Sequence, residues 1–161
     1  MPRIILTTQI KAPVERVFDL ARSIDFHLHS SPDAEKVVAE GKAEGLLELN
    51  DSVTWEGSRF GAPQSLLVRV IQMEPPHCFV DEMVEGAFRR LRHTHTFEEQ
   101  KAGCLMTDEF DYQSRGGPLG WIIENSFLTA SLRRLLSDRN KILKQAAESD
   151  EWKEFLSSDS N

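Results

Sequence analysis

The chain has 161 residues, of which 40% are hydrophobic and 28% are charged, and its formal net charge is −7. These values are typical of one soluble globular domain and argue against a disordered chain. The negative charge argues against nucleic acids or anionic membranes as electrostatic partners. No apolar run approaches the ~20 residues that cross a bilayer, so membrane insertion is not expected.

The first residues lack the apolar stretch and the small-residue cleavage site of a signal peptide. We therefore expect a cytoplasmic protein. The two cysteines, Cys78 and Cys104, are not in a CxxC arrangement. In a reducing compartment they are expected to be free thiols that serve packing rather than chemistry.

The N-terminal part predicts a strand followed by one or two short helices. Residues 3–11 are rich in β-branched residues, which favours a strand. The next segment, 12–23, predicts a helix, and residues 24–31 predict a second short helix or a turn. The apolar positions of the first helix fall at helical spacing: Val14, Val17, Phe18 and Ala21.

The middle of the chain changes to the alternating pattern of strands. Two strands are predicted within 35–61, with a break near Gly41 and Gly45. Short turns join these strands to the following ones, which indicates an antiparallel sheet. The further strands are expected over 63–74, 77–86, 88–100 and 104–114.

The C-terminal part predicts a long helix and an acidic tail. A helix of more than about 25 residues is expected to start near Pro118 and to dock on the sheet through a leucine stripe. We divide the chain into a ligand-binding domain, 1–147, and an acidic, serine-rich tail, 148–161. The leucine stripe consists of Leu128, Leu132, Leu135, Leu136 and Leu143. In the tail, one amphipathic turn is expected from Trp152, Phe155 and Leu156.

Two of the five histidines, His93 and His95, lie one residue apart in a predicted strand. One face of this strand is wholly polar and carries Arg90 and Arg92, which are costly to bury. The opposite face, with both histidines, is therefore expected to point inward. That inward face consists of Leu91, His93, His95 and Phe97.

The following strand is expected to point a carboxylate at the same interior wall. Its aromatic face should be buried, and Asp108 belongs to this face. Asp81, on the preceding strand, is a possible second carboxylate, but the alternation there is ambiguous because both faces carry apolar residues. The inward face of the last strand consists of Met106, Asp108, Phe110 and Tyr112.

Three uses of this His–Asp group remain open. It can be a self-satisfied polar network that lines a pocket, because buried polar groups find partners. It can transfer protons, since a His–Asp pair is a common acid–base unit. It can also bind a metal, but no tight ligand spacing supports three ligands. We predict neither a metal nor a cofactor. His27 and His29 project about 200° apart on a helix, so at most one faces the pocket, and we expect exposed histidines at its mouth.

The order of segments resembles the START-like or SRPBCC superfamily, which has the helix-grip fold and includes polyketide cyclase/dehydrase-like proteins. The resemblance lies in "IKAPVERVFDLARSID", "DSVTWEGSRFG", "FVDEMVEGAFRRLRHTHTFEE", "CLMTDEFDYQ" and the closing "RGGPLGWIIENSFLTASLRRLLSDRNKILK". It covers roughly residues 3–146. One departure is Gly86–Ala87, where related sequences often have Gly-Pro.

The resemblance implies an α+β, helix-grip fold. A curved antiparallel sheet of about six or seven strands would wrap a long C-terminal helix, with a ligand cavity between them. Fold alone does not decide function, because such proteins include carriers, cyclases and hydrolases. The residues expected to line the cavity are Trp55, Asp81, His93, His95, Met106, Asp108, Phe110 and Tyr112.

Three functions follow as hypotheses. The first is a non-catalytic carrier or sensor of a small hydrophobic or amphipathic molecule, as a monomer or homodimer. The second is a cyclase, dehydratase or hydrolase that uses His93 or His95 with Asp108 for acid–base chemistry. The third is an interaction protein with a vestigial pocket. We favour the first, and the ligand is then the only partner expected besides a second copy of the chain.

Overall fold

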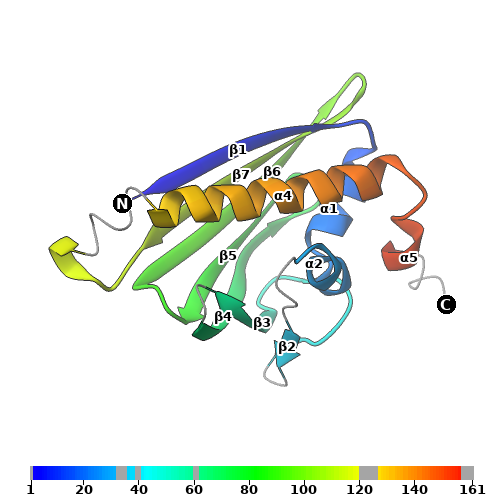
Figure 1. Ribbon diagram of the computed structural model, residues 1–161. Coiled ribbons are helices and arrows are strands. Elements are labelled where there is room, and N and C mark those ends of the chain that lie inside the picture. Colours follow the sequence, from blue (N-terminus) through cyan, green and yellow to red (C-terminus); the bar gives the residue numbers. More distant parts are fainter. Residues whose placement is uncertain (1, 32–35, 39–40, 60–61, 120–126, 157–161) are drawn as a thin grey trace.

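The fold is a seven-stranded antiparallel sheet and a long C-terminal helix (Figure 1). The computed structural model describes residues 2–31, 36–38, 41–59, 62–119 and 127–156. The strands are β1 (Arg3–Ile10), β2 (Lys36–Val38), β3 (Ser52–Arg59), β4 (Ala62–Glu74), β5 (Cys78–Glu85), β6 (Arg90–Gln100) and β7 (Gly103–Gln113). The helices are α1 (Val14–Ala21), α2 (Ile24–Ser30), α4 (Thr129–Glu148) and α5 (Lys153–Leu156).

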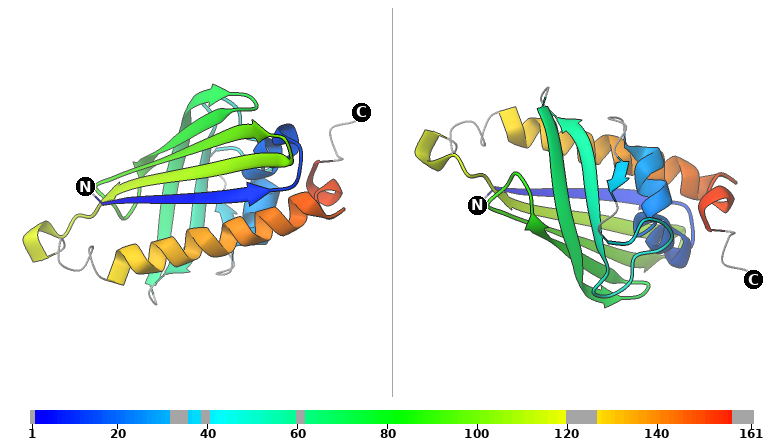
Figure 2. Two further views of the ribbon diagram at one scale, coloured as in Figure 1. Left: turned by 90° about the horizontal axis from the view of Figure 1, so that it is seen from above. Right: turned by 90° about the horizontal axis from the view of Figure 1, so that it is seen from below.

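The strand order in the sheet is β1-β7-β6-β5-β4-β3-β2, so the first strand pairs with the last. The two views of Figure 2 show β3 and β4 crossing the direction of β1 and β7, which makes the sheet strongly curved. The long helix α4 runs along the sheet beside β1, and α1 and α2 cover one end. The predicted α+β, helix-grip architecture is confirmed.

A glycine turn determines how β6 and β7 pair. Gly103 has a φ of +140°, and a Cβ there would lie 2.1 Å from the carbonyl oxygen of Ile10. Only glycine fits this backbone. The turn places His95 directly opposite Asp108 and His93 opposite Phe110. The register of this hairpin therefore brings the two histidines and the carboxylate together.

The leucine stripe of α4 packs onto the sheet as predicted. Leu132, Leu136 and Leu143 are 3%, 5% and 7% exposed. In the structure α4 has 20 residues, from Thr129 to Glu148. A helical turn covers 117–119, and residues 120–126 of the predicted helix lie outside the described residues.

Two apolar residues on either side of the undescribed part are exposed: Leu119 is 76% exposed and Phe127 is 65% exposed. The continuity of the helix from Pro118 to α4 depends on residues outside the described ranges and stays a prediction.

The C-terminal residues return to the body of the protein. The side chains of Trp152, Phe155 and Leu156 pack against the core around α1, as their predicted amphipathic turn suggests. The ring of Phe155 meets that of Phe26 edge to face with centroids 5.1 Å apart. The boundary between domain and tail at residue 147 stays a prediction.

Candidate functional site

The inward face of β6 is the face that the sequence indicates. Leu91 and Phe97 are each 3% exposed, and His93 between them is 9% exposed. On the other face, Arg92 pairs with Glu82 at 3.1 Å. The desolvation argument thus gave the correct orientation for both histidines.

The inward face of β7 also agrees with the sequence. Met106, Asp108, Phe110 and Tyr112 are all buried. The Tyr112 hydroxyl lies 2.5 Å from Oγ1 of Thr129, which satisfies the only polar atom of this side chain. Asp108 is 3% exposed, so its carboxylate depends on nearby partners rather than on water.

Asp108 has three hydrogen-bond partners from two elements. Its Oδ1 lies 3.1 Å from Nε2 of His93 and 2.8 Å from Nδ1 of His95. The side-chain amide of Asn140, on α4, donates to Oδ2 at 2.6 Å. Both carboxylate oxygens are therefore engaged, which stabilises the charge in a buried position.

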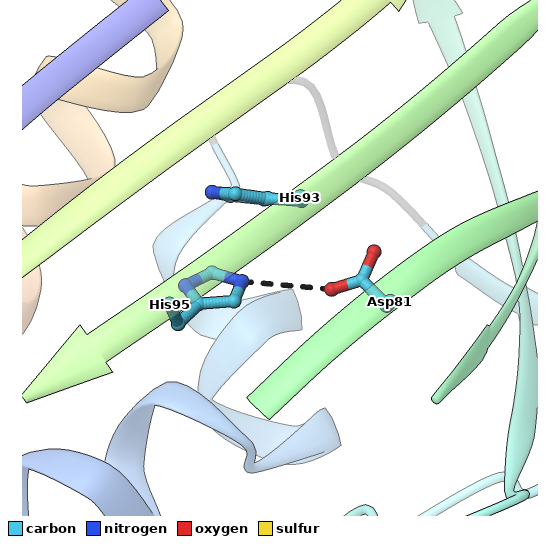
Figure 3. A group of neighbouring side chains, drawn as sticks. All are labelled: Asp81, His93 and His95. Carbon is cyan, nitrogen blue, oxygen red and sulfur yellow. Dashed lines mark ion pairs between the residues drawn. The ribbon is translucent and has the colours of Figure 1, made fainter. Parts of the chain in front are cut away.

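Asp81 also points into this group, which the sequence left undecided. Its Oδ2 lies 3.5 Å from Nε2 of His95, across β5 and β6 (Figure 3). The ambiguity arose because the neighbouring residues Phe79 and Val80 are both buried, at 2% and 1% exposure. The strand therefore lacks the simple alternation on which the inward–outward assignment depends.

These contacts give the two histidines different charge states. Burial alone would lower the pKa of His95, but hydrogen bonds from its ring to Asp108 and Asp81 outweigh this and raise the pKa to about 9. Burial and the neighbouring charge of His95 lower the pKa of His93. At neutral pH, His95 is therefore an imidazolium between two carboxylates, and His93 is a neutral imidazole.

The pKa values of the two carboxyl groups are lowered, whereas that of His95 is raised. Burial would raise the pKa of Asp108, but its hydrogen bonds with His93 and His95 hold that pKa well below its usual range. The pKa of Asp81 is likewise lowered, because the hydrogen bond with His95 overcomes the effect of burial. Both groups are thus ionised in the folded protein.

A cavity of about 110 Å³ lies beside this polar group, between the sheet and α4. Its wall is mostly apolar, with Trp55, Leu66, Phe110 and Leu135 among the lining residues. A smaller cavity of about 30 Å³ lies behind it. Cavities with apolar walls and a few convergent polar groups are the usual form of small-molecule sites.

The predicted lining residues divide between the two cavities. The larger cavity is lined by Trp55, Asp81, His93, His95 and Phe110. The smaller one is lined by His93 and His95 together with Met106 and Asp108. Among the described residues that line these two cavities, Tyr112 is absent, because its ring packs in the core with Ile4 and Leu91. A ligand-binding role for each of these residues stays a prediction.

Sequence reasoning missed two residues of the site, Arg139 and Asn140, and left open which histidine of α2 reaches it. The ring of His27, on α2, stacks on Trp55 with centroids 3.7 Å apart, and Arg139 donates to its Nδ1. Arg139 lines both cavities, and Asn140 lines the smaller one. The sequence could have indicated Arg139 and Asn140, because they follow the buried Leu136 by three and four residues and so lie on the same face of the helix.

The other helix histidine faces away from the cavity. His29 is ion-paired with Glu151 at 3.0 Å, and its side chain is 44% exposed. Only one of the two histidines of α2 therefore reaches the site, as the helix geometry predicts. In the described ranges, no helix is long and apolar enough to span a membrane.

The group can do three things chemically. A neutral imidazole and an amide can orient a polar ligand atom at the end of an apolar cavity. The same imidazole, next to Asp108, can exchange a proton with a bound molecule. Finally, Asp81, His93 and His95 each provide one possible metal-ligating atom, and these atoms lie within 4.8 Å of one another.

A curved sheet that wraps a long helix, with a lined cavity between them, defines a helix-grip protein. The model of the family "Polyketide cyclase / dehydrase and lipid transport" matches residues 10–136. The chain belongs to this family, within the SRPBCC or START-like group that its sequence resembles. No curated protein matches the sequence.

Solved structures share the fold at low sequence identity. Protein TTHA0849 from Thermus thermophilus is 18% identical, with a TM-score of 0.74 over 91% of this chain and 97% of its own. Protein CV1439 from Chromobacterium violaceum is 16% identical, with a TM-score of 0.68 over 92% and 98%. Major latex-like protein 151 from Panax ginseng is 14% identical, with a TM-score of 0.64 over 92% and 98%. At these identities the likeness is one of fold alone.

Proposed function

We propose that this protein binds a small hydrophobic or amphipathic molecule in the cavity between the sheet and α4, as a non-catalytic carrier or sensor. The observation that carries the proposal is the mostly apolar cavity of about 110 Å³ with a polar group at one end. The family is described as one of polyketide cyclases, dehydrases and lipid transport, which agrees with an apolar ligand.

The size of the cavity favours a ligand part of about one ring. A cavity of the order of 150 Å³ encloses benzene in another protein. Burying about 150 Å² of apolar ligand surface contributes about 4 kcal/mol, which corresponds to a Kd near the millimolar range. Hydrogen bonds to the polar group, or a part of the ligand that extends through the cavity mouth, would strengthen binding.

The polar contacts favour orientation of a ligand over catalysis. Asp108 is bonded on both oxygens, and His95 lies between two carboxylates. Asp108 and His95 therefore already have hydrogen-bond or ion-pair partners on the atoms that would accept or donate a proton. The neutral ring of His93 is the group best placed to meet a ligand atom.

The proposal can be tested with small aromatic and short-chain aliphatic molecules that each carry one hydroxyl or carboxyl group. We expect isothermal titration calorimetry and ligand-detected NMR to find binding in this set. Leu135→Trp, which fills the larger cavity, should weaken binding about tenfold or more, a loss of about 1.4 kcal/mol. The matched change Leu119→Trp lies on an exposed residue and should leave binding unchanged. Binding that is equal in both variants would contradict the proposal.

The alternative is an acid–base enzyme of the cyclase, dehydratase or hydrolase kind. The observation that favours it is the neutral His93 beside Asp108, at 3.1 Å. The variants His93→Gln and His95→Gln separate the two functions. A carrier should show a modest loss of ligand affinity, whereas an enzyme should lose several orders of magnitude in rate with little change in binding.

The compartment and the assembly remain part of the proposal. We propose a cytoplasmic location, with which the two free cysteines of the structure agree. Its edge strands β1 and β2 could pair with a second copy, so the proposal includes a monomer or a homodimer. Size-exclusion chromatography with light scattering distinguishes the two states.

A further inference from the structure

Three side chains on two neighbouring strands bring possible metal-ligating atoms close together. His93 and His95 come from β6 and Asp81 comes from β5 (Figure 3). Their possible ligand atoms lie within 4.8 Å of one another. In a tetrahedral zinc site, bonds of 2.0–2.2 Å place the ligand atoms about 3.3 Å apart. The 3.5 Å between Asp81 Oδ2 and His95 Nε2 is already close to this spacing.

A second carboxylate lies where it can orient both rings. Asp108 Oδ1 contacts Nε2 of His93 and Nδ1 of His95, so the nitrogens left to bind a metal are Nδ1 of His93 and Nε2 of His95, the latter now facing Asp81. Metal-bound histidines almost always bond a carboxylate or carbonyl through the second nitrogen, which determines the tautomer and the ring orientation. Asn140 in turn orients Asp108 by donating to its Oδ2.

The two cavities meet at His93 and His95, which line both of them. Asp81, His93 and His95 all line the larger cavity, which is the route to the group. Asp108 and Asn140 line the smaller cavity behind it. A metal bound by the first three residues would therefore have a coordination position open toward the ligand cavity. Sites with three protein ligands and one open position are typical of catalytic or ligand-binding metals.

The charges of the site also suit a cation. Asp81 and Asp108 carry two negative charges, and Arg139 in the same cavity carries one positive charge. Binding of a cation would displace the proton that His95 carries at neutral pH, and with both imidazoles neutral the site is net negative. Two imidazoles and one carboxylate form the ligand set that suits Zn²⁺ and non-haem Fe²⁺, whereas Ca²⁺ and Mg²⁺ prefer oxygen ligands alone.

We propose that Asp81, His93 and His95 bind one divalent first-row transition-metal ion, Zn²⁺ or Fe²⁺, with Asp108 as the group that orients both histidines. This site goes beyond the binding of an apolar molecule and does not depend on it. It also differs from the expectation of no metal, which the sequence suggested because no tight ligand spacing supported three ligands.

The first experiment uses the full chain without a histidine tag, after removal of metals with a chelator. Co²⁺, which gives visible absorption bands in such sites, is titrated into the protein, and Zn²⁺ is then added. We expect one equivalent of Co²⁺ to bind and one equivalent of Zn²⁺ to displace it. The absence of Co²⁺ bands at saturation, together with no Zn²⁺ binding by calorimetry, would overturn the proposal.

Variants then locate the ion. Asp81→Asn and His93→Gln should each weaken Co²⁺ binding at least about tenfold, and Asp108→Asn should weaken it about 10- to 100-fold. His29 pairs with Glu151, and the ring of His77 lies against the backbone oxygen of Phe97, so both are outside the group. His29→Gln and His77→Gln should therefore leave the affinity unchanged. Binding that survives both ligand variants, or that is lost in His29→Gln, would place the ion elsewhere and reject this site.

A second measurement uses only the wild-type protein, so it stays informative if a substitution unfolds the chain. In the wild-type protein, Zn²⁺ should shift the ring resonances of His93 and His95 in NMR spectra, while those of His29 and His77 stay in place. The opposite pattern would refute the site without any substitution. Because these readouts need no organic ligand, a failed metal test leaves the cavity proposal to be judged by its own experiment.

Discussion

Nδ1 of His95 lies 2.8 Å from Oδ1 of Asp108, directly across the β6–β7 pair, and both side chains face the interior. On its other side, the same ring faces Asp81. This arrangement places one imidazolium between two carboxylates in the middle of the sheet. The contribution of this arrangement to the free energy of unfolding can be measured without a ligand.

Stability should fall at alkaline pH because of His95. Its pKa of about 9 in the folded protein lies above the ~6.5 of an unfolded histidine. The resulting stabilisation is fully present below pH ~6.5 and is lost as the pH rises to about 9. It amounts to about 3 kcal/mol. Urea unfolding of metal-free protein between these pH values measures it.

The variant His95→Gln serves as the test of this assignment. It should be less stable than the wild type at pH ~6 by about 3 kcal/mol, and the difference should shrink toward pH ~9. The control His29→Gln keeps the wild-type profile, since its ion pair with Glu151 is partly exposed. A His95→Gln profile parallel to the wild type would contradict the prediction.

Removing the charge of Asp108 should be more damaging than removing that of a neighbouring aspartate. Asp108→Asn leaves the buried His95 with one carboxylate less, and we expect a loss of about 3 kcal/mol in unfolding free energy. Asp111, on the same strand, pairs with Arg3, whose side chain is 56% exposed. Asp111→Asn should therefore change stability by about 1 kcal/mol or less. Equal losses in the two variants would show that Asp108 has no special role.

The docking of the C-terminal residues predicts that they contribute to stability. Phe155 packs edge to face on Phe26, so Phe155→Ala should lower the unfolding free energy by about 2 kcal/mol. Its exposed neighbour Glu154 provides the control, and Glu154→Ala should stay within about 0.5 kcal/mol of the wild type. Thermal unfolding measures both. An unchanged Phe155→Ala variant would mean that the segment is a dispensable tail.

The two cysteines should differ in reactivity. Burial raises the pKa of the Cys104 thiol to about 11 and also raises that of Cys78. Because the thiolate is the reactive form, Cys104 should resist thiol reagents until the protein unfolds. Cys78 is only partly buried and should react first. Mass spectrometry of protein labelled under native conditions tests this order, and rapid labelling of Cys104 would contradict it.

The sequence by itself determined which way most of the polar residues point. Alternation along a strand is local, so the two arginines on one face of β6 were sufficient to direct His93 and His95 inward. The aromatic residues of β7 did the same for Asp108. The leucine stripe similarly indicated the buried face of α4. These assignments needed no knowledge of the neighbouring elements.

Only the tertiary structure decided which groups meet. The inward orientation of Asp81 was hidden because Phe79 and Val80 are both buried. The contacts of His27 with Trp55 and Arg139 join two helices and a strand that are distant in sequence. Such contacts depend on how elements pack, and periodicity within one element carries no information about its partner. For that reason the sequence predicted most residues of the site, whereas the cavity and the grouping of Asp81, His93 and His95 beside it depend on how the elements pack.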